Sequence, residues 1–374
     1  MEAYFDNSAT TIVTDSVKDI VVKTMTEDFG NPSAMHMVGV KAEKYIKEAQ
    51  ENIAKILKVD PKEIFFTSGG TESNNMAIIG TAMANKRKGN KIITTSVEHS
   101  SVLATMKYLE EQGFEVIYLP VDRYGVVQME ALEKEMTEDT ILVSTMYVNN
   151  EVGTINNIKE LAEICKSRDV KIHSDLTQAL GKLRINVSDL GLDFASCSAH
   201  KIYGPKGIGA AFLKSDAYGI PPITALLHGG EQEYGLRAGT LAVHNIVGFG
   251  KAAEIALRDM DNTEKHIKRM DEYALRKLQE IEEVELCNPT EKRIPGIISI
   301  LINKTNFHNE RFIKKVSDQL AISSGSACSA GEPSYVIKAM GLEKKVTKVL
   351  RITINKHTSK EDIDQLVTII SNTI

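Results

Sequence analysis

A lysine near the middle of the chain stands where a sheet would deliver it to a binding cleft. Lys201 follows an apolar run, 194–197, and precedes a Gly/Pro loop that begins at Gly204. An apolar run that ends in small polar residues and a loop is typical of a strand reaching the open edge of an α/β sheet, where ligands bind. A lysine amine in a partly desolvated cleft becomes a nucleophile suited to an aldehyde. The plainer interpretation is a solvated loop lysine.

One of the four cysteines also has a setting that favours chemistry. Cys328 lies among small residues, 323–331, and such an accessible segment suits a reactive thiol. We expect Cys165 on an amphipathic helix and Cys197 in an apolar strand, where core packing explains both, and Cys287 in a strand. Because no C-x-x-C pair occurs, the sequence predicts neither a disulfide framework nor a standard zinc site.

Several polar side chains fall at the ends of expected strands or in the turns after them. They are Thr71, His99, Asn150, Asp175, Gln178, Ser198, His200 and Lys201. In a sheet with right-handed crossovers, the carboxyl ends of parallel strands share one rim. We therefore expect these side chains to lie together around one site.

The turn at 68–75 predicts where an anion would bind. A short strand at 64–67 leads through Gly69 and Gly70 into a helix, so free amides and the helix dipole face the ligand. Thr71 can cap this helix and contact the anion. The pattern is neither G-x-G-x-x-G nor a Walker loop, which disfavours a nucleotide. A simple capped helix is the alternative.

The remaining rim residues fit one cofactor. Ser198 and His200 flank Lys201 and could hold a phosphate, and lysine beside phosphate donors is what pyridoxal phosphate needs. Asp175 could pair with the pyridinium nitrogen and Gln178 could bind the ring hydroxyl. His99 could stack on the ring and move protons near neutral pH. A capping or surface histidine and a helix-capping aspartate are the plainer alternatives.

Composition and charge limit the class of protein. A chain of 374 residues predicts two domains, and a net charge of −5 argues against a general nucleic-acid or lipid-surface binder. The first residues show neither a basic nor an apolar signal-peptide region, and no apolar run approaches the ~18 residues of a membrane span. We therefore expect a cytoplasmic protein.

Several segments resemble the cysteine desulfurases, the NifS/IscS-like group of pyridoxal-phosphate enzymes. The matching segments are 6–11, 29–33, 67–75, 198–207, 228–241 and 351–353. The resemblance covers nearly the whole chain, in register. It departs at Ser8, where alanine is common, and after Cys328, where four residues precede Pro333 and the corresponding stretch is usually longer.

The resemblance implies an α/β fold of type I, as in the pyridoxal-phosphate transferases. Residues 15–258 would form a large domain with a mainly parallel seven-stranded sheet flanked by helices. Residues 1–14 and 259–374 would form a smaller α+β domain that carries the cysteine loop. The βα alternation through residue 213 and the change in composition over the last hundred residues agree with this division.

The resemblance also assigns residue roles. Lys201 would bind the cofactor aldehyde and then move the Cα proton of L-cysteine, with His99 assisting. Arg351 and Asn150 would hold the substrate carboxylate, with Ala9 and Thr10 nearby. The Cys328 thiolate would take the sulfur as a persulfide and leave L-alanine. Gly70 would lie in the phosphate cup, and Thr240 would reach the phosphate of the neighbouring subunit, which implies a homodimer.

The implied partner is a sulfur acceptor from iron–sulfur assembly, tRNA thiolation or cofactor sulfuration. Cys328 could also ligate an iron–sulfur cluster transiently while a scaffold protein is docked. The short stretch after Cys328 predicts a slower enzyme or a different acceptor. A selenocysteine lyase, an aminotransferase and a non-catalytic pyridoxal-phosphate protein remain alternatives, although an aminotransferase has no use for Cys328.

Overall fold

A computed structural model describes residues 3–288, 290–325 and 333–374. Its larger sheet has seven strands in the order β2-β8-β7-β6-β5-β3-β4. The strands are β2 (Ile64–Thr67), β3 (Lys91–Thr95), β4 (Glu115–Leu119), β5 (Thr140–Ser144), β6 (Lys171–Asp175), β7 (Phe194–Ser198) and β8 (Gly209–Leu213). Strands β4, β3, β5, β6 and β7 pair in parallel, and β8 pairs antiparallel with both β7 and β2. The expected mainly parallel seven-stranded sheet is confirmed.

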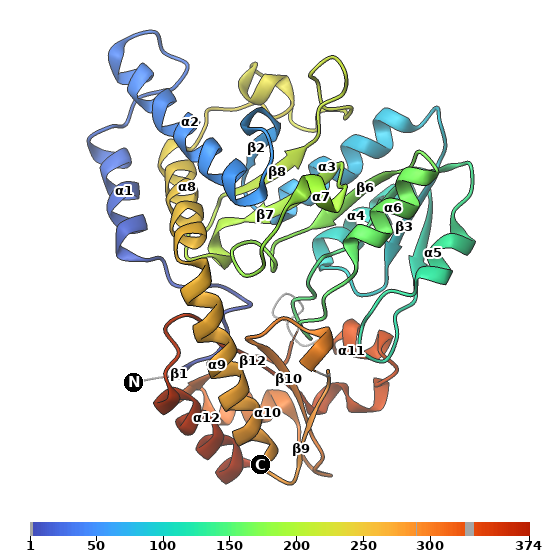
Figure 1. Ribbon diagram of the computed structural model, residues 1–374, viewed down its shortest axis with the longest axis vertical. Coiled ribbons are helices and arrows are strands. Elements are labelled where there is room, and N and C mark those ends of the chain that lie inside the picture. Colours follow the sequence, from blue (N-terminus) through green and yellow to red (C-terminus); the bar gives the residue numbers. More distant parts are fainter. Residues whose placement is uncertain (1–2, 289, 326–332) are drawn as a thin grey trace.

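Helices cover both faces of this sheet (Figure 1). They are α1 (Asp15–Thr26), α2 (Met37–Leu57), α3 (Gly70–Asn85), α4 (Ser100–Glu111), α5 (Met129–Glu135), α6 (Ile158–Ser167), α7 (Val187–Leu190) and α8 (Val243–Arg258). Successive side chains of β8 point to opposite faces of the sheet, so they pack against different helices. Ala210 and Phe212 join the core built with α2, α6 and α8, whereas Ala211 and Leu213 pack against α3.

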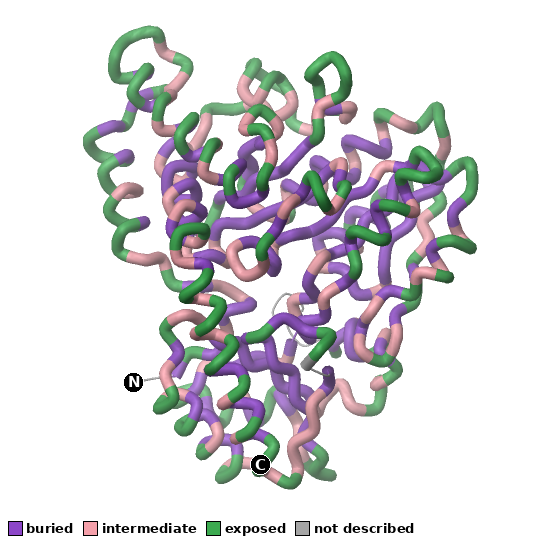
Figure 2. Tube along the Cα trace, viewed as in Figure 1, coloured by how far each residue is buried: buried purple, intermediate pink, exposed green. Residues whose placement is uncertain are grey.

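A second, smaller sheet lies at the other end of the molecule (Figure 1). It has the antiparallel order β12-β10-β9, from β9 (Val284–Leu286), β10 (Ile297–Ile302) and β12 (Val349–Thr353). The helices here are α9 (Met260–Gln279), α10 (Asn309–Val316), α11 (Tyr335–Ala339) and α12 (Lys360–Thr373). The N-terminal strand β1 (Ala3–Tyr4) pairs in parallel with β11 (Leu320–Ala321), and Phe5 is buried in the same small core. The buried segments of both cores are visible in Figure 2.

Short 3-10 turns complete the fold. They are η1 (Pro61–Glu63), η2 (Ala199–Lys201), η3 (Gln232–Gly235), η4 (Thr290–Lys292) and η5 (Glu343–Lys348). Within the described ranges, no helix is both long and apolar enough to cross a membrane.

The structure differs from the sequence expectations in detail. The sequence alone predicts strands over 91–97 and 141–148, whereas β3 and β5 end at Thr95 and Ser144, so the polar rim residues lie on longer loops. The sequence also predicts one long helical stretch over 243–282, whereas the structure has two helices, α8 and α9, that meet at Asp259. Cys287 lies one residue beyond β9 and donates its backbone N–H to Ser299.

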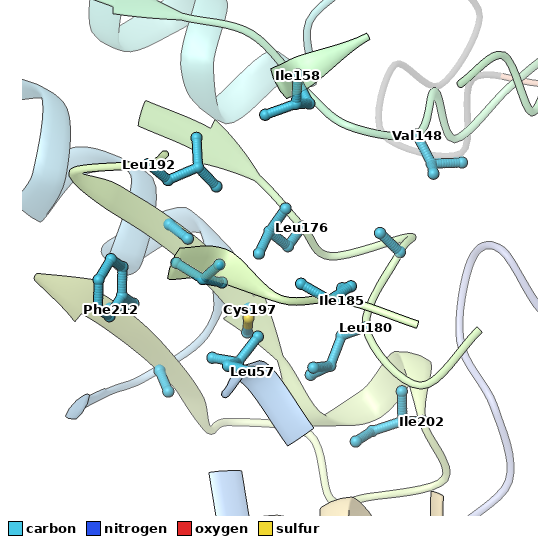
Figure 3. Close-up of a cluster of buried hydrophobic side chains, with 14 of the residues drawn as sticks. Leu57, Val148, Ile158, Leu176, Leu180, Ile185, Leu192, Cys197, Ile202 and Phe212 are labelled. Atoms are coloured by element: carbon cyan, nitrogen blue, oxygen red, sulfur yellow. The ribbon is translucent and has the colours of Figure 1, made fainter. Parts of the chain in front are cut away.

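Apolar side chains anchor the loops at the carboxyl ends of β6 and β7 (Figure 3). Leu176 and Leu180 leave the loop after β6 and enter the core, as does Ile202 after β7. All three are nearly inaccessible to solvent. The polar residues between them are therefore held by packing as well as by hydrogen bonds.

Candidate active site

A cavity of about 250 Å³ lies at the carboxyl ends of β6 and β7. The sequence-predicted residues that line it are Ala9, Gly70, Thr71, His99, Asn150, Asp175, Gln178, Ser198, His200, Lys201 and Arg351. Thr10 lines an adjoining depression, together with Thr71, Ser198 and His200. Thr240 is exposed and lines neither hollow. Cys328 lies outside the described residues.

The depression is built around the first turn of α3. Gly69, with φ 155° and ψ −180°, occupies backbone space that essentially only glycine adopts. A Cβ on Gly70 would lie 3.1 Å from the Thr177 hydroxyl, so glycine permits this close packing. The first amides of α3 have no helical acceptor, so they are available to bind an anion. Glu72, in the same turn, is held away by a forked ion pair with Arg237, at 2.8 and 3.2 Å.

Asp175 is a buried carboxylate whose partners are neutral. One oxygen accepts from the backbone amide of Thr177 at 2.8 Å, and the other accepts from Asn74 Nδ2 at 2.9 Å. Asp175 is 5% exposed and takes part in no ion pair with the described residues. A buried carboxylate without a cation is costly, so this site favours a ligand that brings a positive N–H group.

Asn74 and Ser101 connect Asp175 with His99. The Asn74 amide also donates to Ser101 Oγ at 2.9 Å, and Ser101 Oγ lies 2.8 Å from His99 Nδ1. The backbone amide of Ser101 donates to the same Nδ1 at 3.2 Å. Because Nδ1 is an acceptor here, a neutral His99 carries its proton on Nε2. A neutral His99 therefore has a defined tautomer.

The N-terminal arm closes the cavity beside Lys201. The Lys201 amine donates to the backbone carbonyls of Ser8 and Ala9, the latter at 2.7 Å. Gln178 Nε2 donates to the same Ser8 carbonyl at 3.0 Å. His200 Nδ1 lies 3.2 Å from Thr10 Oγ1. Burial, followed by the charge of Lys201, lowers the pKa of His200 to about 4, so this imidazole is neutral at pH 7.

Arg351 lies at the opposite wall, on β12, and is 1% exposed. Its Nη1 donates to the carbonyls of Asn150 and Gly325, both at 2.9 Å. Its Nη2 donates to Asp6 at 2.8 Å and to Ser323 at 3.2 Å. Nε has no acceptor among the described residues, and the buried Oδ1 of Asn150 has no donor among them.

Sequence reasoning missed two buried carboxylates, Glu151 in the cavity lining and Glu98 outside it. Glu98 is fully buried, and burial raises its pKa to about 8 although Thr95 and the amide of Met146 donate to it. Burial also raises the pKa of Glu151, which accepts from Ser334 Oγ at 2.5 Å.

Other missed residues are Asn74, Ser101, Thr177, Tyr335 and Lys182. The Tyr335 hydroxyl donates to the Glu98 carbonyl at 2.6 Å. Glu98, Ser101 and Glu151 each lie within two residues of a predicted site residue, and Asn74 lies three residues after Thr71, which was the available signal.

The other cysteines are structural. Cys165, Cys197 and Cys287 are buried, and burial raises the pKa of all three thiols, to about 12 for Cys165 and about 11 for Cys287. Within the described ranges, no group of three or more His, Cys, Asp or Glu side chains is placed to hold a metal ion.

The cavity has the features that pyridoxal phosphate requires. The uncompensated carboxylate of Asp175 fits a pyridinium N–H, and a lysine amine lies in the same cavity. The amide turn at Gly70, with Ser198 and His200, fits the phosphate. Oδ1 of Asn74 is buried without a hydrogen-bond partner in the described chain, as expected where a ligand completes the network.

The chain belongs to the aminotransferase class-V family, whose sequence profile matches residues 3–366. Among proteins of known name, it is similar to a cysteine desulfurase IscS of Neisseria meningitidis serogroup A. The two are 40% identical over 375 residues, which cover 99% of this chain and 92% of that protein. A cysteine desulfurase IscS of Dictyoglomus turgidum is also 40% identical, over 378 residues covering 100% of this chain and 94% of that protein.

Solved structures show the same relationship. A structure titled "NIFS-LIKE PROTEIN" superposes with a TM-score of 0.92 at 37% identity, covering 100% of this chain and 99% of the other. A second, "SspA in complex with cysteine", gives a TM-score of 0.82 at 33% identity, covering 96% of this chain and 100% of the other. Pyridoxal 5′-phosphate is the cofactor of this family, in agreement with the cavity.

Proposed function

We propose that the chain is a pyridoxal-phosphate-dependent cysteine desulfurase. It converts L-cysteine to L-alanine and transfers the sulfur to Cys328. The observation that carries this proposal is the single cavity that joins Lys201, the uncompensated Asp175 carboxylate and the buried Arg351 guanidinium. Proteins of this overall similarity bear the name cysteine desulfurase, and one similar structure is titled as a complex with cysteine.

The residues of the cavity have distinct roles in this reaction. Asp175 holds the protonated ring nitrogen, Gln178 binds the ring hydroxyl, and the α3 amides, Thr71, Ser198 and His200 bind the phosphate. When bound, pyridoxal phosphate supplies an electron sink for charge at the substrate Cα. Lys201 binds the cofactor aldehyde and later moves the Cα proton.

The substrate side uses other walls of the cavity. Arg351 and Asn150 orient the carboxylate of L-cysteine, and Ala9 and Thr10 border the substrate. His99, as the Nε2–H tautomer, can donate a proton from Nε2.

Sulfur transfer needs a thiolate outside the cofactor set. The Cys328 thiolate attacks the substrate sulfur, so an S–S bond forms as the substrate C–S bond breaks. The electron pair of the C–S bond stays with carbon, which is then protonated to give L-alanine. Gly325 and Ser334 flank the segment that carries Cys328, and Gly325 provides an Arg351 acceptor at the cavity wall. Ser334 donates to Glu151, which also lines the cavity, and these contacts of Gly325 and Ser334 support the role proposed for Cys328.

The active unit in this proposal is a homodimer. Thr240 is exposed in the single chain, as a residue that reaches the phosphate of a second subunit would be. Large apolar side chains near the start of α2 are also unusually exposed, among them Phe29, Met37 and Met35, which is 98% exposed. A second copy that covers such a patch would remove this apolar surface from water.

The proposed domains are residues 15–258 and a small domain of 1–14 with 259–374. The small core supports this division, because Phe5 packs there with side chains from α9, β10 and α12. We place the enzyme in the cytoplasm, where a protein acceptor from iron–sulfur assembly or from tRNA or cofactor thiolation receives the sulfur. Inserting two residues after Cys328 tests the acceptor proposal, because persulfide transfer should then change.

The activity test uses the purified dimer with L-cysteine and a reductant. We expect an absorption band typical of enzyme-bound pyridoxal phosphate, together with equal amounts of alanine and sulfide. Replacing Cys328 with alanine should abolish sulfide release and leave the absorption band. Unchanged alanine and sulfide production by this variant would contradict the proposal, and faster turnover of selenocysteine with no cysteine turnover would identify a selenocysteine lyase.

A further inference from the structure

Lys182 is a charged residue that the mechanism above does not use, although it lies next to the cofactor cavity. It follows the loop after β6 and lines a second cavity, of about 100 Å³, between that loop and the junction of α8 and α9. Lys201 lines both this second cavity and the cofactor cavity. Lys182 therefore sits behind the cofactor-binding wall rather than in it.

The Lys182 amine makes one hydrogen bond within the described part of the chain. Its Nζ donates to Oε1 of Gln178 at 2.6 Å. Gln178 is 3% exposed, and its Nε2 donates to the Ser8 carbonyl. Burial, followed by the charge of Lys201, lowers the pKa of Lys182 to about 7. A lysine amine donates a hydrogen bond whether or not it is protonated, so the bond to Gln178 forms in both states.

The two partners of Gln178 fix the orientation of its amide. In the reversed orientation, Oε1 would face the Ser8 carbonyl, acceptor against acceptor, and Nε2 would face the Lys182 amine, donor against donor when that amine is protonated. Oε1 accepts from Lys182, and one N–H of Nε2 donates to Ser8. The group that Gln178 can present to a ligand in the cavity is therefore the second N–H of Nε2. That N–H can donate to the ring oxygen, and it donates more strongly to a ring oxygen with negative charge than to a protonated one.

We propose that Lys182 is a positioning residue that fixes the Gln178 amide with its N–H toward the cofactor ring oxygen. It acts through Gln178 and touches neither cofactor nor substrate. Lys182 donates to Gln178, and Gln178 would donate to the ring oxygen. Gln178 and Lys201 both donate to the Ser8 carbonyl, which links this hydrogen-bond network to Lys201. This inference rests on the cofactor role proposed for Gln178.

The test measures the cofactor rather than turnover. Lys182→Met removes the donor and keeps a long side chain, and we expect the Kd for pyridoxal phosphate to rise about tenfold, as for one hydrogen bond. The absorption maximum of the bound cofactor should also shift, because the ring oxygen loses an oriented donor. Lys182→Arg keeps a donor, has room in the adjoining cavity, and should retain the wild-type Kd and band.

The matched control is Lys356→Met. Lys356 lines the same second cavity and lies 4.2 Å from the Tyr203 ring centre, with no bond to Gln178. Its pKa is also lowered by burial. Loss of Lys356 should leave both the Kd and the absorption maximum unchanged.

A double-mutant comparison shows whether Lys182 acts through Gln178. In a Gln178→Ala background, Lys182→Met should cause no further change in Kd or absorption. Equal Kd and spectra for Lys182→Met and wild type would overturn the proposal, as would a full, additive effect in the Gln178→Ala background. The same comparison with Lys182→Leu, which also lacks a donor, covers the case in which the methionine variant does not fold. The Kd of the wild type is measured in the same series. If the wild type binds pyridoxal phosphate tightly, the proposed cofactor site exists, and an unchanged Kd for Lys182→Met then counts against the role of Lys182 alone.

Discussion

The guanidinium of Arg351 donates to the carboxylate of Asp6 at 2.8 Å, so a small-domain strand is tied to the N-terminal arm at the wall of the cavity. Ser323 and the carbonyls of Asn150 and Gly325 also accept from this guanidinium. Nε of this guanidinium lacks an acceptor among the described residues. A bidentate contact with a substrate carboxylate therefore requires Arg351 to release Asp6 or Ser323.

If Arg351 binds the substrate carboxylate as proposed, Asp6 competes with that carboxylate for the guanidinium. Asp6→Asn keeps an acceptor oxygen but removes the negative charge, so we expect the KM for L-cysteine to fall by about three- to tenfold. Steady-state kinetics measure the change. The matched variant is Asp193→Asn, whose carboxylate pairs with Lys171 away from the cavity and should not alter KM. An unchanged or higher KM for Asp6→Asn would show that the two carboxylates do not compete.

The Asn74 amide is the link between Asp175 and the Ser101–His99 pair. Asn74→Ala removes a hydrogen bond to a buried carboxylate and the donor that orients Ser101. We expect kcat to fall about 10- to 100-fold. The neighbouring Asn75→Ala removes only a bond to the Thr71 carbonyl on the same helix and should change kcat by less than about twofold. Similar kinetics for the two variants would argue against the network.

Glu98 gives the stability a defined dependence on pH. The native carboxyl keeps its proton up to about pH 8, whereas the unfolded chain loses it near the ordinary pKa of 4.5. Between these values the native state binds more protons, so the free energy of unfolding falls as pH rises. This contribution is about 1.4 kcal/mol per pH unit and is absent from Glu98→Gln.

Urea unfolding at a series of pH values measures this effect. The stability of Glu98→Gln relative to wild type should therefore rise from about pH 5 to about pH 8. Burial lowers the pKa of His173 to about 4, so this residue makes the free energy of unfolding rise with pH, opposite to Glu98. Both proteins contain His173, so its contribution cancels in the comparison. A constant difference across this range would mean that Glu98 is ionised in the native protein.

Hybrid dimers test whether Thr240 serves the other subunit. Lys201→Ala removes the cofactor-binding amine, and Thr240→Glu places a negative charge against the phosphate. Each homodimer should be inactive. If Thr240 acts across the interface, one site of every hybrid is intact, and random mixing restores about a quarter of the sites. No recovery of alanine production after mixing and confirmed subunit exchange would place Thr240 in its own subunit.

Much of the fold was predictable because local patterns coincide with the elements. The run Lys171 to Asp175 is β6 in the structure, and the Gly69–Gly70 turn leads directly into α3. The break at Asp259 left no such signal, since neither glycine nor proline occurs there and the two helices meet through tertiary packing. Helix propensity alone is a weak guide at such a point.

The site was predictable only in part. Asp175 ends the short strand predicted at 171–175, and Lys201 follows the apolar run 194–197. The role of Asn74 depends on a hydrogen bond to a residue 101 positions away, and the Lys182–Gln178 bond depends on which way a loop turns. Three-dimensional hydrogen-bond partners of this kind have no local pattern, so they became visible only in the structure.

Mass spectrometry of the peptide that contains Cys328 tests whether this thiol receives the sulfur. The purified enzyme is mixed with L-cysteine without reductant, alkylated and digested. We expect the Cys328 peptide to gain the mass of one sulfur atom, with alanine formed in equal amount, and the buried Cys165, Cys197 and Cys287 to remain unchanged. Alanine formation with no added sulfur on Cys328 would contradict the proposed persulfide chemistry.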